Sequence, residues 1–227
     1  MDGAPAQPIG RVRGVVFDLD GTLVDGYEGI ASGVNAARRA FGLPPLAQDD
    51  VRGRVGLGLT HLMSDVLGPE RAAAGAEIFA ETYDRVCETE THAVLGLVET
   101  LAALRSRGVR IGLASNKPVH FSIRILERLG VISLFDAIEG PETAGAIKPD
   151  PRMIRACLRA MNVESPDAIY VGDMLIDAEA GDRAGVDVVL VAGGSCSADE
   201  LRATGRPVLA SLNELLAWIP DAPTRLR

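Results

Sequence analysis

Two aspartates stand two residues apart at the end of a short apolar segment. Asp18 and Asp20 follow the apolar residues 14–17 and are followed by Gly21, which permits a tight exit from a strand. With this spacing both carboxylates can face one crevice. Two carboxylates this close repel each other unless a cation lies between them. Mg²⁺ prefers oxygen ligands and would resolve the conflict; an acidic turn without a function is the alternative.

Two further polar groups follow later in the chain. Ser115-Asn116-Lys117 comes after the apolar segment 109–114, and a hydroxyl with neighbouring backbone N–H groups can hold phosphate oxygens. Ordinary turn chemistry explains a Ser-Asn pair equally well. Pro149 restricts Lys148 to an extended conformation and so directs its side chain. An exposed lysine is the simpler explanation, unless a phosphate has to be balanced by a fixed cation.

A second pair of acids follows the apolar segment 168–171. Asp173 and Asp177 are four residues apart, one helical turn, so both can face the same crevice. Two acids at the start of a helix, favoured by the helix dipole, are the alternative.

Helices and apolar segments alternate through most of the chain. Three helical patterns end at Gly108, Gly130 and Gly185, and each glycine is followed by a buried segment. Strands of this kind, alternating with helices, predict an α/β fold: a Rossmann-like parallel sheet with helices on both faces. Ligands bind such sheets at the carboxyl ends of the strands, where the four polar groups lie. We expect strands at 12–18, 109–114, 131–138, 168–171, 186–191 and 207–209, and helices at 101–107, 123–129, 151–161, 178–184 and after Ser211.

Residues 26–92 interrupt this alternation. They contain no convincing strand, and helical patterns occur at 30–41, 50–54, 59–67 and 70–88. About 65 residues is too long for a simple crossover. We therefore expect a small all-helical domain at 26–92, inserted into a sheet domain formed by residues 1–25 and 93–227.

Together the four polar groups resemble the four motifs of the haloacid dehalogenase superfamily of phosphohydrolases. The matching stretches read DxDGTL, SNK, KP and GDxxxD, and the helical insert resembles the cap domain of that family. The resemblance covers essentially the whole chain. It implies an enzyme in which Asp18 attacks phosphorus and carries the phosphoryl group. Asp20 would be the general acid for the leaving oxygen and then the base for water.

The same resemblance implies a metal site and a phosphate site. The residues implied for the Mg²⁺ site are Asp18, Asp20, Asp173 and Asp177, with Asp18 and Asp173 contributing carboxylates and Asp20 its backbone carbonyl. Asp177 would order a bound water or Lys148 rather than touch the metal. The residues implied to bind phosphate are Ser115, Asn116, Lys148 and Thr22, and Lys148 also offsets the charge of Asp18.

Asp20 separates the branches of the family. Dehalogenases lack this second carboxylate, and phosphonate hydrolases usually have alanine there together with a cap lysine. No lysine occurs between residues 26 and 92, so both branches are disfavoured. Phosphosugar mutases tend to carry a His-Lys pair in the cap, whereas His61 has no lysine neighbour. A mutase or a phosphatase of sugar phosphates or nucleotides remains the alternative, and a non-catalytic binding protein is the least favoured.

Within the phosphatases, the segments 51–58, 115–118 and 191–194 resemble those of phosphoglycolate phosphatases. This favours 2-phosphoglycolate as the substrate. Arg52 or Arg54 could then pair with the substrate carboxylate; a solvated arginine beside a glycine turn is the alternative.

The resemblance implies a small phosphorylated metabolite as the partner, and the composition of the chain is consistent with this. The chain has 227 residues, of which 47% are hydrophobic and 24% charged, and its formal net charge is -8 without a basic stripe, which disfavours nucleic acid. Cys87, Cys157 and Cys196 form no CxxC pair, as expected for free thiols in a reducing compartment. No apolar run reaches the roughly 18 residues of a membrane span. The first ten residues lack the apolar core of a signal peptide. We expect a cytoplasmic monomer or homodimer with a short disordered N-terminal tail.

Overall fold

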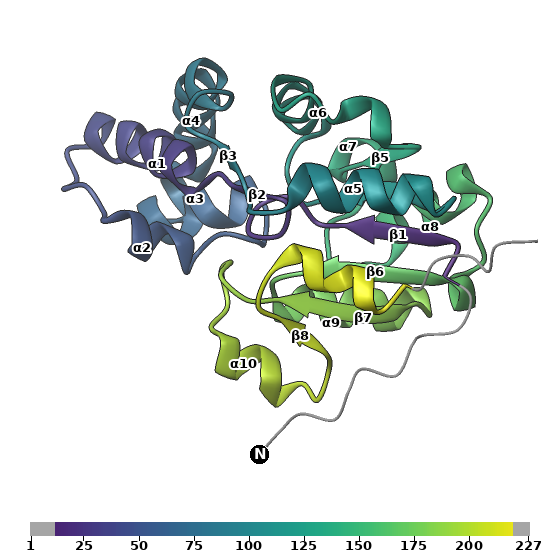
Figure 1. Cartoon of the computed structure of the whole chain (residues 1–227). Coiled ribbons are helices and arrows are strands. Elements are labelled where there is room, and N and C mark those ends of the chain that lie inside the picture. The colour runs from purple at the N-terminus through teal and green to yellow at the C-terminus, as the bar shows by residue number, and fades with distance from the viewer. Residues whose placement is uncertain (1–11, 220–227) are drawn as a thin grey trace, which may run out of the picture.

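A parallel sheet forms the centre of the computed structural model, which describes residues 12–219 (Figure 1). Its strand order is β5-β4-β1-β6-β7-β8, and every neighbouring pair is parallel. β1 lies between β4 and β6, so β4 and β5 lie on one side of it and β6, β7 and β8 lie on the other. Polar groups after β1, β4 and β6 therefore meet at one edge of the sheet. The strands are β1 (Gly14–Phe17), β4 (Arg110–Ala114), β5 (Ala137–Glu139), β6 (Ala168–Gly172), β7 (Asp187–Val191) and β8 (Val208–Leu209).

Both faces of the sheet are covered, as the continuously apolar strands predict. Val15 and Phe17 of β1 are fully buried in one core cluster, whereas Val16 is fully buried in another on the opposite face. Three helices contribute to the first cluster: α5 (Leu97–Ser106), α6 (Val119–Arg128) and η4 (Leu212–Ala217). Two contribute to the second: α8 (Arg152–Met161) and α9 (Leu175–Ala184). The expected α/β fold is confirmed.

Residues 26–92, the helical insert, form helices that pack on one another beside the sheet (Figure 1). α1 begins at Tyr27 and ends at Ala40, with Glu28 in its first turn and two arginines in its last, as the helix dipole favours. The apolar cluster of the insert also takes in Phe121 of α6, so the insert packs against the sheet domain. Its helices are α1 (Tyr27–Ala40), α2 (Gln48–Arg52), α3 (Leu59–Leu67), η1 (Pro69–Arg71) and α4 (Ala72–Val86).

The chain enters and leaves the insert through two adjacent short strands. β2 (Val24–Asp25) and β3 (His92–Ala93) pair in antiparallel fashion, and the N–H of Val94 donates to the carbonyl of Leu23. The two connections therefore run side by side as one narrow link.

One expected strand is shorter than predicted. The segment 131–138 begins with the helical turn η2 (Ile132–Leu134), and only Ala137–Glu139 pairs with β4. The turn is needed because the chain has to pass from the end of α6 to the edge of the sheet, where the N–H of Asp136 donates to Ile111. The remaining short helices are α7 (Pro141–Ala144), η3 (Ser165–Asp167) and α10 (Ala198–Ala203).

Between residues 12 and 219, none of the helices has the length and apolar character needed to cross a bilayer. The expected N-terminal tail lies outside the described residues.

Candidate active site

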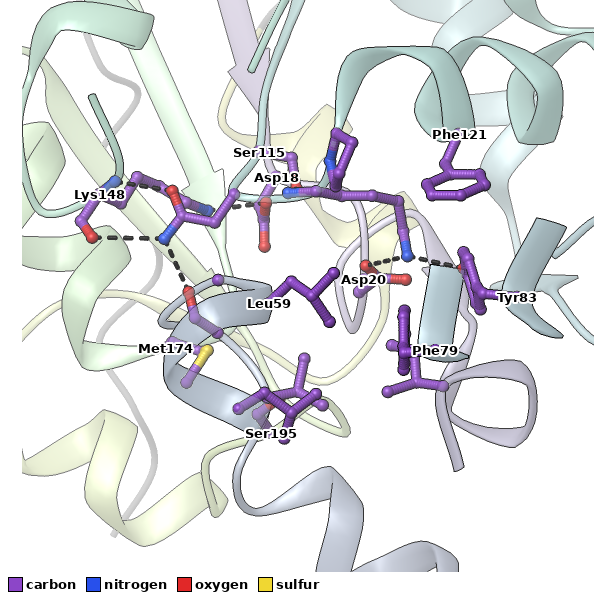
Figure 2. Close-up of a pocket in the computed structure, with 18 residues that line it drawn as sticks. Asp18, Asp20, Leu59, Phe79, Tyr83, Ser115, Phe121, Lys148, Met174 and Ser195 are labelled. Atoms are coloured by element: carbon purple, nitrogen blue, oxygen red, sulfur yellow. Dashed lines mark hydrogen bonds and ion pairs between the residues drawn. The ribbon is translucent and has the colours of Figure 1, made fainter. Parts of the chain in front are cut away.

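A pocket lies where the carboxyl edge of the sheet faces the helical insert (Figure 2). The sheet domain contributes polar residues to its lining: Asp18, Asp20, Ser115, Asn116, Lys117, Lys148 and Ser195. The insert contributes mainly apolar ones: Ile30, Val55, Leu59, Leu62 and Phe79, together with Tyr83. Polar groups that the sequence places far apart thus share one cavity.

Asp18 and Lys148 form the floor of this pocket. The N–H of Asp18 donates to the carbonyl of Val171 on β6, which fixes the residue just beyond β1. Nζ of Lys148 lies 2.7 Å from Oδ1 of Asp18, 2.7 Å from Oδ1 of Asp177 and 3.0 Å from the hydroxyl of Tyr170. Burial alone would lower the pKa of Lys148, but the two carboxylates raise it above its ordinary value. The lysine is therefore a fixed cation beside Asp18.

The side chain of Asn116 holds the backbone of Lys148. Its amide oxygen accepts from the N–H of Lys148 at 2.7 Å, and its amide nitrogen donates to the carbonyl of Gly56 in the insert at 2.7 Å. These contacts occupy the amide of Asn116, so the predicted phosphate contact of this residue would have to come from its backbone. Ser115, which was also predicted to bind phosphate, is buried and lines the pocket beside it.

Three buried aspartates form an acidic group next to Asp18. Asp18, Asp173 and Asp177 each offer a carboxylate oxygen, and the three oxygens lie within 4.8 Å of one another. Burial, followed by the charges of Asp177 and Asp18, raises the pKa of Asp173 well above its usual range. A divalent cation would relieve this crowding of negative charge, so the residues fit a metal with oxygen ligands. The sheet edge thus brings Asp18 and Asp173 together, as the motif order predicts.

Asp177 contacts both Lys148 and the start of α9. Its Oδ1 contacts Lys148, and its Oδ2 accepts from the N–H groups of Asp173 and Met174. The contact with Lys148 suits the expected role of orienting that lysine.

Thr22 and two glycines enclose Asp173. The hydroxyl of Thr22 donates to Oδ1 of Asp173 at 3.1 Å, and the N–H of Ser195 donates to Oδ2 at 2.7 Å. The side chain of Thr22, which was predicted to bind phosphate, is fully buried and contacts this aspartate. A Cβ at Gly21 or Gly194 would overlap the carboxylate of Asp173, so only glycine leaves room for it.

Asp20 turns away from the acidic group toward Lys117. Nζ of Lys117 lies 3.0 Å from Oδ2 of Asp20 and 2.7 Å from the hydroxyl of Tyr83, which belongs to α4 of the insert (Figure 2). Burial raises the pKa of Asp20 above its ordinary value, and the nearby Lys117 opposes that rise. The side chain of Asp20 is thus not part of the acidic group, and only its backbone remains a candidate metal ligand.

The two arginines considered for the substrate carboxylate lie outside the pocket lining. Nη1 of Arg54 is 2.9 Å from Oδ2 of Asp65, and its side chain is 42% exposed. Arg52 packs over the ring of Tyr27 and donates to the carbonyl of Gly193. The structure therefore does not bring Arg54 to the other predicted site residues, since an acid in the next helix holds it.

Sequence reasoning missed Lys117 and Tyr83 as site residues. One signal was present: the chain contains only two lysines, Lys117 and Lys148, and both follow apolar segments of the sheet domain. In the structure both ammonium groups are buried in the pocket, with side-chain exposures of 7% and 2%. Tyr83 carried no such signal, because an aromatic residue within a helical pattern is ordinarily a core residue.

The fold and these four motifs define a family. The family model of haloacid dehalogenase-like hydrolases matches residues 15–191. The chain belongs to this family, and its phosphatase relatives make it a phosphoric monoester hydrolase.

The chain is similar to named phosphatases and to solved structures. A phosphoglycolate phosphatase from Cereibacter sphaeroides is 39% identical over 184 residues, covering 78% of this chain and 84% of the relative. An N-acetylmuramic acid 6-phosphate phosphatase from Pseudomonas aeruginosa is 31% identical and covers 80% of this chain and 82% of its own length. Among solved structures, a predicted phosphatase from Clostridium acetobutylicum has a TM-score of 0.81 at 27% identity, covering 90% of this chain and 96% of that one.

Proposed function

We propose that this protein is a Mg²⁺-dependent phosphatase that hydrolyses 2-phosphoglycolate through an aspartyl-phosphate at Asp18. The observation that carries the proposal is the position of Asp18, whose carboxylate lines the pocket 2.7 Å from the ammonium of Lys148 and forms the acidic group with Asp173 and Asp177. Relatives named phosphoglycolate phosphatase support the choice of substrate.

The chemistry divides into two displacements. An oxygen of Asp18 attacks phosphorus, the bond to the ester oxygen breaks, and the carboxyl proton of Asp20 passes to the departing alkoxide. The carboxylate of Asp20 then takes a proton from water as that water attacks the aspartyl-phosphate. Inorganic phosphate leaves and Asp18 is restored. Lys148 balances charge on Asp18 and on the phosphoryl oxygens throughout.

Asp18, Asp173 and the backbone carbonyl of Asp20 would hold the Mg²⁺. When bound, the ion would supply positive charge to the phosphoryl oxygens. Thr22, Ser195 and Gly194 keep Asp173 in place for this role. Asp177 would act indirectly, by fixing Lys148.

The pocket wall favours a small leaving group over a sugar. Sugar hydroxyls lose hydrogen bonds to water on binding and need polar partners in return. The insert presents Leu59, Leu62 and Phe79 on its side of the pocket instead. A two-carbon leaving group asks for fewer such partners.

The insert would act as a cap over this pocket. We propose domain limits of 26–92 for the cap and of 1–25 with 93–227 for the catalytic core. The paired strands β2 and β3 connect the cap to the catalytic core. Because this link is narrow, the cap could pivot by small backbone rotations in these two connections. Closure would exclude bulk water during the first displacement, and opening would release products.

Phosphate release from a panel of esters tests the proposal. The panel holds 2-phosphoglycolate, N-acetylmuramic acid 6-phosphate, glucose 1-phosphate and a nucleoside monophosphate, each with Mg²⁺ and with excess chelator. We expect 2-phosphoglycolate to have the highest kcat/KM and turnover to stop with chelator. An Asp18→Asn variant should lose at least about 1,000-fold in kcat. Isomerisation of glucose 1-phosphate without phosphate release would favour a mutase instead.

A further inference from the structure

Lys117 is a buried cation on the leaving-group side of the pocket. Its ammonium contacts Oδ2 of Asp20 and the hydroxyl of Tyr83, and it lies 4.4 Å from the centre of the Tyr83 ring. Asp20, the proposed acid, must reach the ester oxygen to deliver its proton. A group one carbon beyond that oxygen therefore lies within reach of Lys117.

The other lysine of the pocket, Lys148, already contacts three groups: Asp18, Asp177 and Tyr170. Among the described residues that line the pocket, Lys117 and Lys148 are the only lysines or arginines. An ammonium has three donors, and two of those of Lys117 contact Asp20 and Tyr83. One donor therefore remains for a ligand.

We propose that Lys117 determines substrate specificity by binding a carboxylate carried on the carbon next to the ester oxygen. This inference rests on the proposed function, in which Asp20 protonates that oxygen. The facing wall is apolar, with Leu59, Leu62 and Phe79, and offers a carboxylate no competing partner. A site built around a charged group discriminates strongly against an analogue that lacks it. The selected substrates are short phosphate esters of 2-hydroxy acids.

The kinetic test compares two esters of equal carbon number. 2-Phosphoglycolate carries the carboxylate and ethyl phosphate does not, so the ratio of their kcat/KM values measures recognition of that group alone. We expect Lys117→Met to lower this ratio about 100-fold, as for loss of a charged hydrogen bond. Lys117→Arg, which keeps the charge, should recover part of the preference. Because Lys117 also contacts Asp20, its loss could slow proton transfer for every ester. Such an effect lowers kcat/KM for both esters alike and cancels in their ratio.

The variant Arg54→Met provides the matched comparison, since it removes a cation of the insert that pairs with Asp65 outside the pocket lining. We expect it to keep the wild-type ratio. Loss of the preference in Arg54→Met, with an unchanged ratio in Lys117→Met, would overturn the role of Lys117.

A binding measurement gives a readout independent of turnover. Because the chain has only two lysines, Asp18→Asn protein carrying ¹⁵N-labelled lysine should give two side-chain ammonium signals, and adding Lys117→Met identifies one of them. With Mg²⁺ present, 2-phosphoglycolate should shift the Lys117 signal and ethyl phosphate should leave it nearly in place. A response confined to Lys148 would overturn the inference.

Different results would contradict the proposed substrate and the proposed role of Lys117. Wild-type enzyme that hydrolyses both esters with equal kcat/KM would defeat 2-phosphoglycolate as the substrate and the inference with it. A wild-type preference that survives intact in Lys117→Met would defeat the inference alone.

Discussion

The ammonium of Lys148 lies 2.7 Å from the carboxylate of Asp18 and equally close to that of Asp177, and all three side chains are buried. One cation therefore joins the two sides of the acidic group. The backbone of Lys148 is held as well, by Asn116, whose amide also reaches the insert at Gly56. Position and charge of this lysine are fixed by independent contacts.

Replacing Lys148 by methionine should abolish turnover and lower stability together. The change leaves three buried carboxylates close together without the lysine, and an uncompensated buried charge typically costs about 3–5 kcal/mol. Phosphate release should fall at least about 1,000-fold, and urea unfolding at neutral pH should show the loss of stability. Added Mg²⁺ should restore part of the stability, because the ion supplies positive charge to the same carboxylates. A variant as stable as wild type without metal would contradict this account.

Gly194→Ala should weaken metal binding. The new Cβ would overlap the carboxylate of Asp173, which has to shift or turn. We expect the apparent Mg²⁺ affinity, measured by calorimetry, to fall at least about tenfold, as is typical when a group that orients a metal ligand is changed. Gly53→Ala is the matched control, since a Cβ there meets only a backbone oxygen at 3.9 Å. Unchanged affinity in Gly194→Ala would show that Asp173 is not a ligand.

Arg124→Met should loosen the contact between the insert and the sheet domain. Arg124 of α6 pairs with Asp84 at 2.5 Å and with Glu88 at 2.7 Å, next to the contact between Tyr83 and Phe121. The charged groups are partly exposed, so global stability should change by less than about 1 kcal/mol. Hydrogen exchange of the α4 amides should nevertheless become faster, and scattering should report a larger mean radius. Identical exchange in both proteins would mean that this ion pair does not hold the insert closed.

Asp136 should stabilise the sheet edge above acidic pH. Burial alone would raise the pKa of its carboxyl, but the N–H of Ile111 and the side chains of Arg110 and Arg105 lower it below the ordinary value. A carboxyl whose pKa is lowered on folding contributes stability above its unfolded pKa, about 3.9, and loses that contribution as the pH falls through the folded value. Asp136→Asn should therefore cost about 1–2 kcal/mol at pH 7 and less below about pH 4.

Urea unfolding of both proteins across this pH range measures the difference. Asp150→Asn is the control, because Asp150 pairs with Arg152 at the surface, where the carboxylate side chain is 37% exposed and such a pair contributes little. A stability difference for Asp136→Asn that stays constant with pH would contradict the assignment of the charged form.

The acidic group could be predicted through the resemblance to the four family motifs, which implies that Asp18 and Asp173 share one metal site. The structure supplies the physical reason, because β1 and β6 are neighbouring parallel strands that end at a common edge. The insert could be predicted from periodicity, since a long helical stretch has no place in the alternating pattern.

Side-chain partners were harder to predict because they depend on packing between distant segments. Thr22 and Asn116 lie at the expected places, yet one binds Asp173 and the other binds Lys148 and Gly56. The pair of Lys117 and Tyr83 exists because α4 packs beside α6, a contact between segments 34 residues apart that no local pattern encodes.

The tyrosines, cysteines and lysines of this chain are buried or partly buried, which has a consequence for its behaviour in alkaline solution. Desolvation raises the pKa of all three tyrosines and all three cysteines. The carboxylates beside both lysines outweigh desolvation and raise their pKa values too. Every remaining basic side chain except the histidines is an arginine, which stays protonated past pH 12. Between about pH 9 and 10 the folded protein should therefore lose fewer protons than its unfolded chain, and its electrophoretic mobility should change less across that range than the mobility of the chain in urea.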